Sequence, residues 1–189
     1  MSMKSDDPTP RIAARLKGER DARGWSLADL AQRSGVSKAM ISKIERAEAS
    51  PTAALLGRLS GAFEISLSRL VADPPSPSGR LRRASEAPAW VDPATGYERR
   101  QVSPPSDVPI ELVHVHLPPG ADVPYPESAF VFLRQLVWVL SGRLTFVEGD
   151  VVHHLGPGDC LALGPPSPCR FRNETRRACV YVVALTRKG

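Results

Sequence analysis

The sequence has few cysteines and no long apolar run. Three cysteines in 189 residues are too few for a disulfide framework, and their odd number fits a reducing compartment. No apolar run approaches the ~20 residues that a membrane-spanning helix needs. The N-terminal segment MSMKSDDPTP lacks the apolar stretch of a secretory signal. We therefore expect a cytoplasmic protein without a membrane partner.

Proline is scarce at first and frequent later. Only Pro8, Pro10 and Pro51 precede residue 74, and the other 16 of the 19 prolines lie at residue 74 or later. Up to Val71 the apolar residues recur at the helical period, and later short β-branched runs alternate with turn residues, as in β-sandwiches and barrels. The predicted organisation is a disordered tail (1–10), a helical domain (11–73), a linker (74–87) and a β domain (88–189).

Positive charge is concentrated in the helical domain. Residues 11–70 contain 11 Lys and Arg against six Asp and Glu, whereas residues 104–189 contain eight of each. A localised basic half suggests a polyanionic partner, first of all nucleic acid. In the linker, Arg80, Arg82 and Arg83 form a basic cluster that either reaches the DNA backbone or is a solvated tether.

Capping residues predict five helices, the third of which begins after Ser37 and ends near Arg46. Its Ile41 and Ile44 lie three residues apart and must face the core. The opposite face then carries small and basic residues, which suit the major groove of DNA. The alternative is an ordinary five-helix bundle with a solvated face. The residues of the exposed face are Lys38, Ala39, Ser42 and Lys43.

The stretch SLADLAQRSGVSKAMISKIERAEASPT closely resembles the core of the Cro/C1-type (XRE) helix-turn-helix family. The resemblance implies a lambda-repressor-like bundle that binds double-stranded operator DNA. Ala47 occupies a position where the family usually has glycine, so a left-handed residue there would cost on the order of 1 kcal/mol. The residues expected to contact bases or phosphates are Ser26, Ser37, Lys38, Ala39, Ser42, Lys43 and Arg46.

The second half, including QLVWVLSGRLTFVEGDVVHHLGPGDCLALGPPSPCRFRN, resembles the small cupin domains often fused to such modules. The fold class implied is a two-domain α plus all-β chain, with a cupin double-stranded β-helix (jelly-roll) barrel at the C-terminus. The family's metal-ligand positions fall here at Pro126, Ser128, Gln135 and Cys169. Only the cysteine is a plausible donor, so we expect no metal and no cofactor.

Without a metal, the barrel is expected either to hold an effector or to be filled and to serve dimerisation alone. An effector site would be concave, mostly apolar and equipped with a few polar groups. The residues expected to line it are Tyr125, Ser128, Gln135, Trp138 and Cys169.

Two further sites stay open as minor alternatives. His114 and His116 share a strand face and could bind a metal together with Cys169. Cys169 is also a candidate redox sensor if Arg170 and Arg172 lower the pKa of its thiol.

The sequence therefore predicts a homodimeric, DNA-binding transcriptional regulator that senses a small molecule and is not an enzyme. An effector would shift the two domains relative to each other through the linker. The alternatives are a cupin enzyme with a DNA-targeting module, and an interaction module whose basic helices bind an acidic protein.

Overall fold

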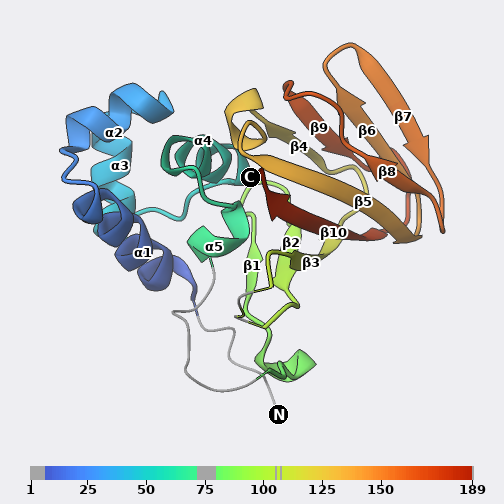
Figure 1. The fold of residues 1–189 in the computed structure, drawn as a ribbon. Helices are drawn as coiled ribbons and strands as arrows, with labels where there is room; N and C mark the ends of the chain where they lie inside the picture. Colours follow the sequence, from blue (N-terminus) through green and yellow to red (C-terminus); the bar gives the residue numbers. More distant parts are fainter. Residues whose placement is uncertain (1–6, 72–79, 105, 107, 189) are drawn as a thin grey trace.

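The computed structural model describes residues 7–71, 80–104, 106 and 108–188, and these form a helical domain beside a β domain (Figure 1). The helices are α1 (Thr9–Ala22), α2 (Leu27–Ser34), α3 (Lys38–Glu45), α4 (Ala53–Phe63) and α5 (Leu67–Val71). The β domain has two 3₁₀ helices, η1 (Ala84–Glu86) and η2 (Glu127–Ala129). Its strands are β1 (Ala89–Val91), β2 (Glu98–Gln101), β3 (Glu111–Leu117), β4 (Asp122–Tyr125), β5 (Leu133–Ser141), β6 (Leu144–Glu148), β7 (Val151–Leu155), β8 (Cys160–Ala162), β9 (Cys169–Arg172) and β10 (Cys179–Arg187). None of the helices in the described ranges is long and apolar enough to cross a membrane.

Side-chain caps fix the starts of three helices. The hydroxyls of Ser26, Ser37 and Thr52 each accept a hydrogen bond from a backbone N–H in the first turn, which satisfies donors that the helix leaves free. Helix α1 begins at Thr9, two residues before the predicted boundary. Thr9 is buried and its hydroxyl lies 2.6 Å from that of Ser50, so residues 9 and 10 belong to the bundle and not to the expected tail.

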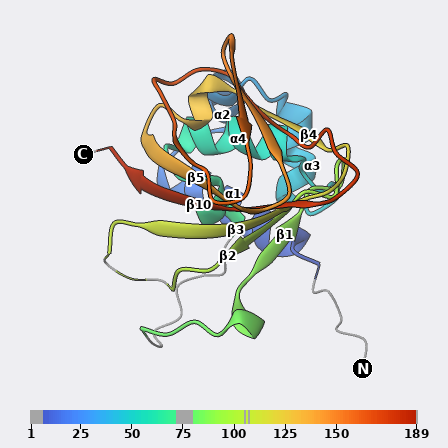
Figure 2. The same ribbon diagram turned by 90° about the vertical axis from the view of Figure 1, so that its right-hand side faces the viewer.

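The β domain consists of two antiparallel sheets. One has the strand order β1-β2-β3-β10-β5-β8 and the other β4-β9-β6-β7. Alternate residues of the strands point between the sheets, where Phe171 stacks on Tyr181 with ring centroids 5.7 Å apart. Figure 2 shows these strands in front of the helices. The five helices and the two antiparallel sheets confirm the predicted two-domain α plus all-β fold class.

The predicted linker is only partly described, because residues 74–79 lie outside the described ranges. From Arg80 onward the chain follows the barrel. Arg82 Nη1 donates a hydrogen bond of 3.3 Å to the carbonyl of Gln101, and Ala87 is buried. Residues 82–87 therefore belong to the β domain.

Helix α4 lies directly against the barrel, between the other helices of the bundle and strand β4 (Figure 1). Two glycines on one side of α4 permit this approach. A Cβ on Gly57 would lie 2.9 Å from the ring of Tyr125, and a Cβ on Gly61 would lie 2.7 Å from the carbonyl oxygen of Ser128. At Gly61 the two domains thus touch through backbone atoms of Ser128, and at Gly57 the helix backbone lies against the Tyr125 ring.

Polar contacts surround this packing. The hydroxyl of Ser66 donates to Glu111 at 2.6 Å, and the buried Arg99 donates to the hydroxyl of Ser68 at 3.1 Å. The guanidinium of Arg187, at the end of β10, donates to the carbonyl of Glu64, which ends α4. These contacts therefore fix the junction between α4 and α5 to the barrel.

Candidate DNA-binding surface and ligand pocket

Helices α2 and α3 form a helix-turn-helix. Gly35 ends α2 with φ +65°, a left-handed conformation that suits glycine, and its N–H donates to the carbonyl of Ala31. Val36 is buried in the turn, and Ser37 caps α3. Ile41 and Ile44 are fully buried, as the three-residue spacing predicted. The opposite face of α3 is thereby fixed toward solvent.

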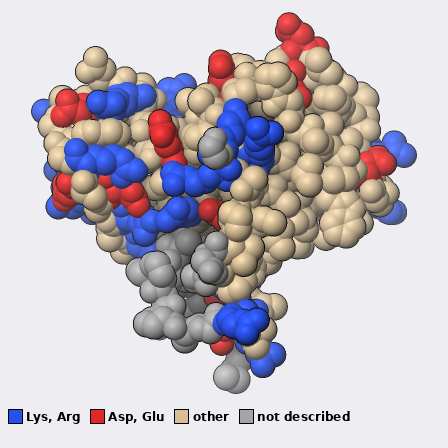
Figure 3. Space-filling model, viewed as in Figure 1, with Lys and Arg blue, Asp and Glu red and all other residues tan. Residues whose placement is uncertain are grey.

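That exposed face carries most of the predicted DNA contacts. Ser37, Lys38, Ala39 and Lys43 are exposed and Ser42 is half-buried. Within the described ranges, neither lysine has an acidic partner. Figure 3 shows that Lys and Arg gather over the helical domain, whereas charged residues are sparse over the barrel. The surface on α3 therefore presents uncompensated positive charge beside small side chains, as a helix that enters the major groove requires.

Two other predicted contacts are already engaged inside the protein. Ser26 donates 2.7 Å to the carboxylate of Asp29 and accepts from the backbone N–H of the same residue, so it caps α2 beside a negative charge. Arg46 forms an exposed ion pair with Glu48, with 2.8 Å between nitrogen and oxygen. Ser26 is therefore a capping residue first, and Arg46 must leave Glu48 to reach a phosphate.

An ion pair that the sequence pattern did not reveal holds α3 in place. Arg20 of α1 binds both carboxylate oxygens of Glu45 at 2.7 and 2.9 Å, and it also donates 2.8 Å to the carbonyl of Trp25. The side chains of Arg20 and Glu45 are only 13% and 8% exposed. A bidentate pair of this kind fixes both distance and angle. It joins the last turn of α3 to α1.

The turn after α3 contains the strain that the sequence predicted. Ala47 has φ +57°, in the left-handed region that favours glycine. Its N–H donates to the carbonyl of Ile44 and the N–H of Glu48 to that of Lys43, so the turn closes the helix in spite of the side chain.

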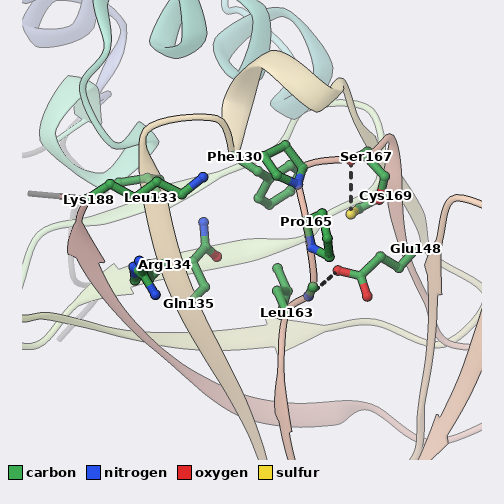
Figure 4. Close-up of a pocket in the computed structure, with 12 residues that line it drawn as sticks. Phe130, Leu133, Arg134, Gln135, Glu148, Leu163, Pro165, Ser167, Cys169 and Lys188 are labelled. Carbon is green, nitrogen blue, oxygen red and sulfur yellow. Dashed lines mark hydrogen bonds between the residues drawn. The ribbon is translucent and has the colours of Figure 1, made fainter.

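The barrel contains a pocket of about 400 Å³, within the usual size range of ligand sites (Figure 4). It lies between the start of β5, the end of β6, the loop from β8 to β9 and the C-terminal end of the described chain. Glu148 accepts a hydrogen bond of 2.8 Å from the N–H of Gly164, which ties this loop to β6. The lining residues are Phe130, Leu133, Arg134, Gln135, Glu148, Leu163, Gly164, Pro165, Pro166, Ser167, Cys169 and Lys188.

The structure brings only two of the five predicted pocket residues together. Gln135 and Cys169 line the pocket. Tyr125 is buried among Phe130 and Phe171 and contacts α4, and Ser128 lies against Gly61 in the domain contact. Trp138 is 49% exposed, because residues 134, 136, 138 and 140 of β5 point away from the barrel interior. Tyr125, Ser128 and Trp138 are therefore not pocket walls.

Some of the pocket residues that were not predicted could have been inferred from a sequence pattern, and others could not. Glu148 lies two residues after the buried Phe146 on β6, so strand alternation could have placed it inward. Lys188 and Pro165 come from the chain end and from a loop, where no periodic pattern indicates direction. Sequence spacing alone could not have found them.

The thiol of Cys169 is not activated. Burial raises its pKa to about 11, and the nearby Glu148 contributes to that rise. Arg170 does not oppose this shift, because it points outward and binds Asp122 with distances of 3.0 and 2.6 Å. A protonated thiol is a poor redox sensor, and the condition for that minor alternative, a pKa lowered by the arginines, is not met here.

The residues present do not fit a metal. His114 and His116 alternate with buried valines and point out of the barrel, whereas Cys169 points inward from the other sheet. Gln135 is a neutral amide and Cys169 a protonated thiol, so neither is a strong ligand. In the described ranges, no group of three or more His, Cys, Asp or Glu is close enough to hold an ion.

Comparisons with known proteins find relatives of the helical domain and a solved structure that resembles nearly the whole chain. Residues 16–70 match the model of the helix-turn-helix family HTH_3. The curated protein HTH-type transcriptional regulator SutR from Escherichia coli K12 is 43% identical over 65 residues, which are 34% of this chain and 36% of that protein. The chain therefore spans only about a third of the length of that curated relative. A crystal structure of an HTH_3 family transcriptional regulator from Vibrio cholerae superimposes with a TM-score of 0.80 and 26% identity, over 96% of this chain and 97% of that one.

Proposed function

We propose that this chain, whose residues 16–70 match the HTH_3 helix-turn-helix model, is a transcriptional regulator that combines a cupin barrel with operator DNA binding through α3. The observation that carries the proposal is the exposed face of α3. Lys38 and Lys43 have no acidic partner in the described ranges, and the pair between Arg20 and Glu45 fixes the helix that carries them. Such a face binds phosphate and base acceptors without first breaking internal contacts.

The proposed regulator is a homodimer that associates through the outer face of the six-stranded sheet. Leu136 and Trp138 are 46% and 49% exposed on β5, and they lie beside Ala184 and Val182 of β10. Leu112 of β3 extends this apolar strip. A self-complementary sheet face gives a two-fold dimer, and a two-fold dimer presents two recognition helices to a palindromic site.

Charge substitution tests this interface. We expect Trp138→Glu to convert a dimer into a monomer in analytical ultracentrifugation, because it would bury an unpaired charge in each copy. Arg143→Glu, in the exposed turn between β5 and β6, is the matched control and should leave the dimer intact. A wild-type monomer, or a Trp138→Glu dimer of unchanged affinity, would contradict the assignment.

The pocket is proposed as an effector site, because two structural links join it to the DNA-binding domain. Its wall at Phe130 and Leu133 follows directly on η2, whose Ser128 touches α4. Lys188 lines the pocket, and the adjacent Arg187 binds the end of α4. Coupling therefore runs through the domain contact, and the residues 74–79 that were expected to transmit it lie outside the described ranges. Among the lining residues only Glu148 and Cys169 are of metal-ligand type, fewer than the three protein ligands usual for a catalytic metal.

Selection from a random duplex library tests DNA binding and identifies the operator sequence in the same experiment. We expect the full chain to enrich an inverted repeat whose half-sites lie about one helical turn apart. With the enriched duplex, Lys43→Gln should reduce both the affinity and the slope of its salt dependence, the slope by about one unit if the lysine contacts phosphate. Arg143→Gln removes the same charge from the barrel and should do neither. An unenriched library, or equal effects of the two variants, would refute the proposal.

A further inference from the structure

The pocket is positively charged on one side. Lys188, which follows β10, is exposed and lines it. Arg134 also borders the pocket, but it belongs to the outward-facing residues of β5 with Leu136 and Trp138. Within the described ranges Lys188 has no acidic partner. The N–H of Lys188 donates 3.0 Å to the carbonyl of Phe132, which holds this chain end beside the pocket.

The opposite side carries one negative charge. Glu148 is the only acidic residue among those that line the pocket, and its side chain is 15% exposed. One of its oxygens accepts from Gly164, and the other lies 3.8 Å from the nearest ring nitrogen of His153, beyond hydrogen-bonding distance. Figure 4 places Glu148 across the pocket from Lys188. One carboxylate oxygen is therefore left for a donor from outside the protein.

The space between the charges is apolar with isolated polar groups. Leu133, Leu163 and Pro165 line it, and Gln135 presents its amide there without a side-chain partner in the described ranges. The hydroxyl of Ser167 is buried and also lacks a partner in that part of the chain. Burying a polar group without a hydrogen bond is costly, so such groups often mark a missing ligand or water.

We propose that the pocket binds an ω-amino carboxylate, a molecule with a carboxylate and an ammonium group at opposite ends of an aliphatic chain. The carboxylate lies against Lys188, the methylene groups lie along Leu133, Leu163 and Pro165, and the ammonium group donates to Glu148. An α-amino acid with an uncharged side chain, such as norleucine, instead carries both charged groups on one carbon. This inference rests on the proposed effector role of the pocket and names the chemical class of the effector.

Isothermal titration calorimetry on the full chain tests the class. The ligands are 4-aminobutanoate, 5-aminopentanoate and 6-aminohexanoate, with hexanoate, hexylamine and norleucine as matched molecules that lack one charge or carry both on one carbon. We expect at least one ω-amino carboxylate to bind about tenfold or more tightly than each matched molecule, because each ion-paired hydrogen bond discriminates by about that factor. Equal binding of hexanoate, or binding of none of the series, would overturn the proposal.

Variants assign the two ends. Glu148→Gln keeps an acceptor for Gly164 but removes the negative charge, so it should weaken the ω-amino carboxylate about tenfold and leave hexanoate unchanged. Lys188→Gln should weaken both carboxylates, and Arg143→Gln should weaken neither. If Glu148→Gln leaves the preference for an ammonium group intact, Glu148 is not its partner. Selection of operator DNA by the same protein is independent of these results, so failure of the ligand class is distinguishable from failure of the regulator.

Discussion

The contact between Gly61 and the barrel gives a sharp prediction for Gly61→Ala. The added methyl group would lie 2.7 Å from the carbonyl oxygen of Ser128 and 2.8 Å from its carbonyl carbon. Both are backbone atoms, so no change of side-chain rotamer relieves the overlap. Either η2 shifts, or α4 moves away from the barrel.

The magnitude follows from two opposing effects. Alanine in the middle of a helix is favoured over glycine by about 0.5–1 kcal/mol. Overpacking of a close contact costs about 1–3 kcal/mol. Gly18 on α1 supplies the matched control, because it is helical, exposed, and has nothing within 4 Å of an added Cβ. Gly18→Ala should therefore raise the free energy of unfolding. The free energy of unfolding of Gly61→Ala should be lower than that of Gly18→Ala by about 1–3 kcal/mol.

Differential scanning calorimetry measures this difference. For a chain of this size 1 kcal/mol corresponds to about 2–4 °C, so Gly61→Ala should melt several degrees below Gly18→Ala. If α4 moves away from the barrel, the calorimetric peak should also split into two transitions. Equal gains in melting temperature for the two variants would show that the domains do not touch in solution as described.

Three further predictions concern the helical domain and the thiols. Ala47→Gly should stabilise the protein by up to about 1 kcal/mol in urea unfolding, because φ +57° strains alanine and not glycine, and a loss of stability would show that the turn is not left-handed. Arg20→Met should destabilise by about 3–5 kcal/mol, since it leaves the buried carboxylate of Glu45 unpaired, and a loss below about 1 kcal/mol would indicate that the pair is solvated. Iodoacetamide at pH 7.5 should modify the exposed Cys160 well before Cys169, whose pKa of about 11 keeps it protonated below that pH; equal rates by peptide mass mapping would refute this.

Local signals in the sequence were sufficient for the helical domain. Ser37 as a cap, Ile41 and Ile44 as core and Ala47 as a strained turn all depend on neighbours within a few residues. The pair between Arg20 and Glu45 spans 25 positions, and nothing in the spacing of either residue indicates it. The pair forms only because α1 packs on α3 in the folded bundle.

The pocket was harder to predict because it is assembled from distant segments. Gln135 and Cys169 were placed by resemblance to cupins, and both line it. Trp138 was misplaced because the facing of β5 depends on register with β10, where Trp138 lies opposite Val182 on the outer side. Tyr125 was misplaced because the helical domain covers this part of the barrel, a contact that neither domain's own pattern reveals.

The close approach of α4 to the barrel also has a consequence for the spacing of operator half-sites. Helix α4, which packs on α2 in the same bundle as the recognition helix α3, meets the barrel through a backbone contact at Gly61, so in the proposed homodimer the two recognition helices keep a set separation and rotation. One base pair inserted between half-sites moves one of them by about 3.4 Å along the duplex and by roughly a tenth of a turn around it. A flexibly tethered pair of domains would absorb that change. This protein should instead reject the altered site, and an effector that shifts η2 against α4 would alter which spacing it accepts.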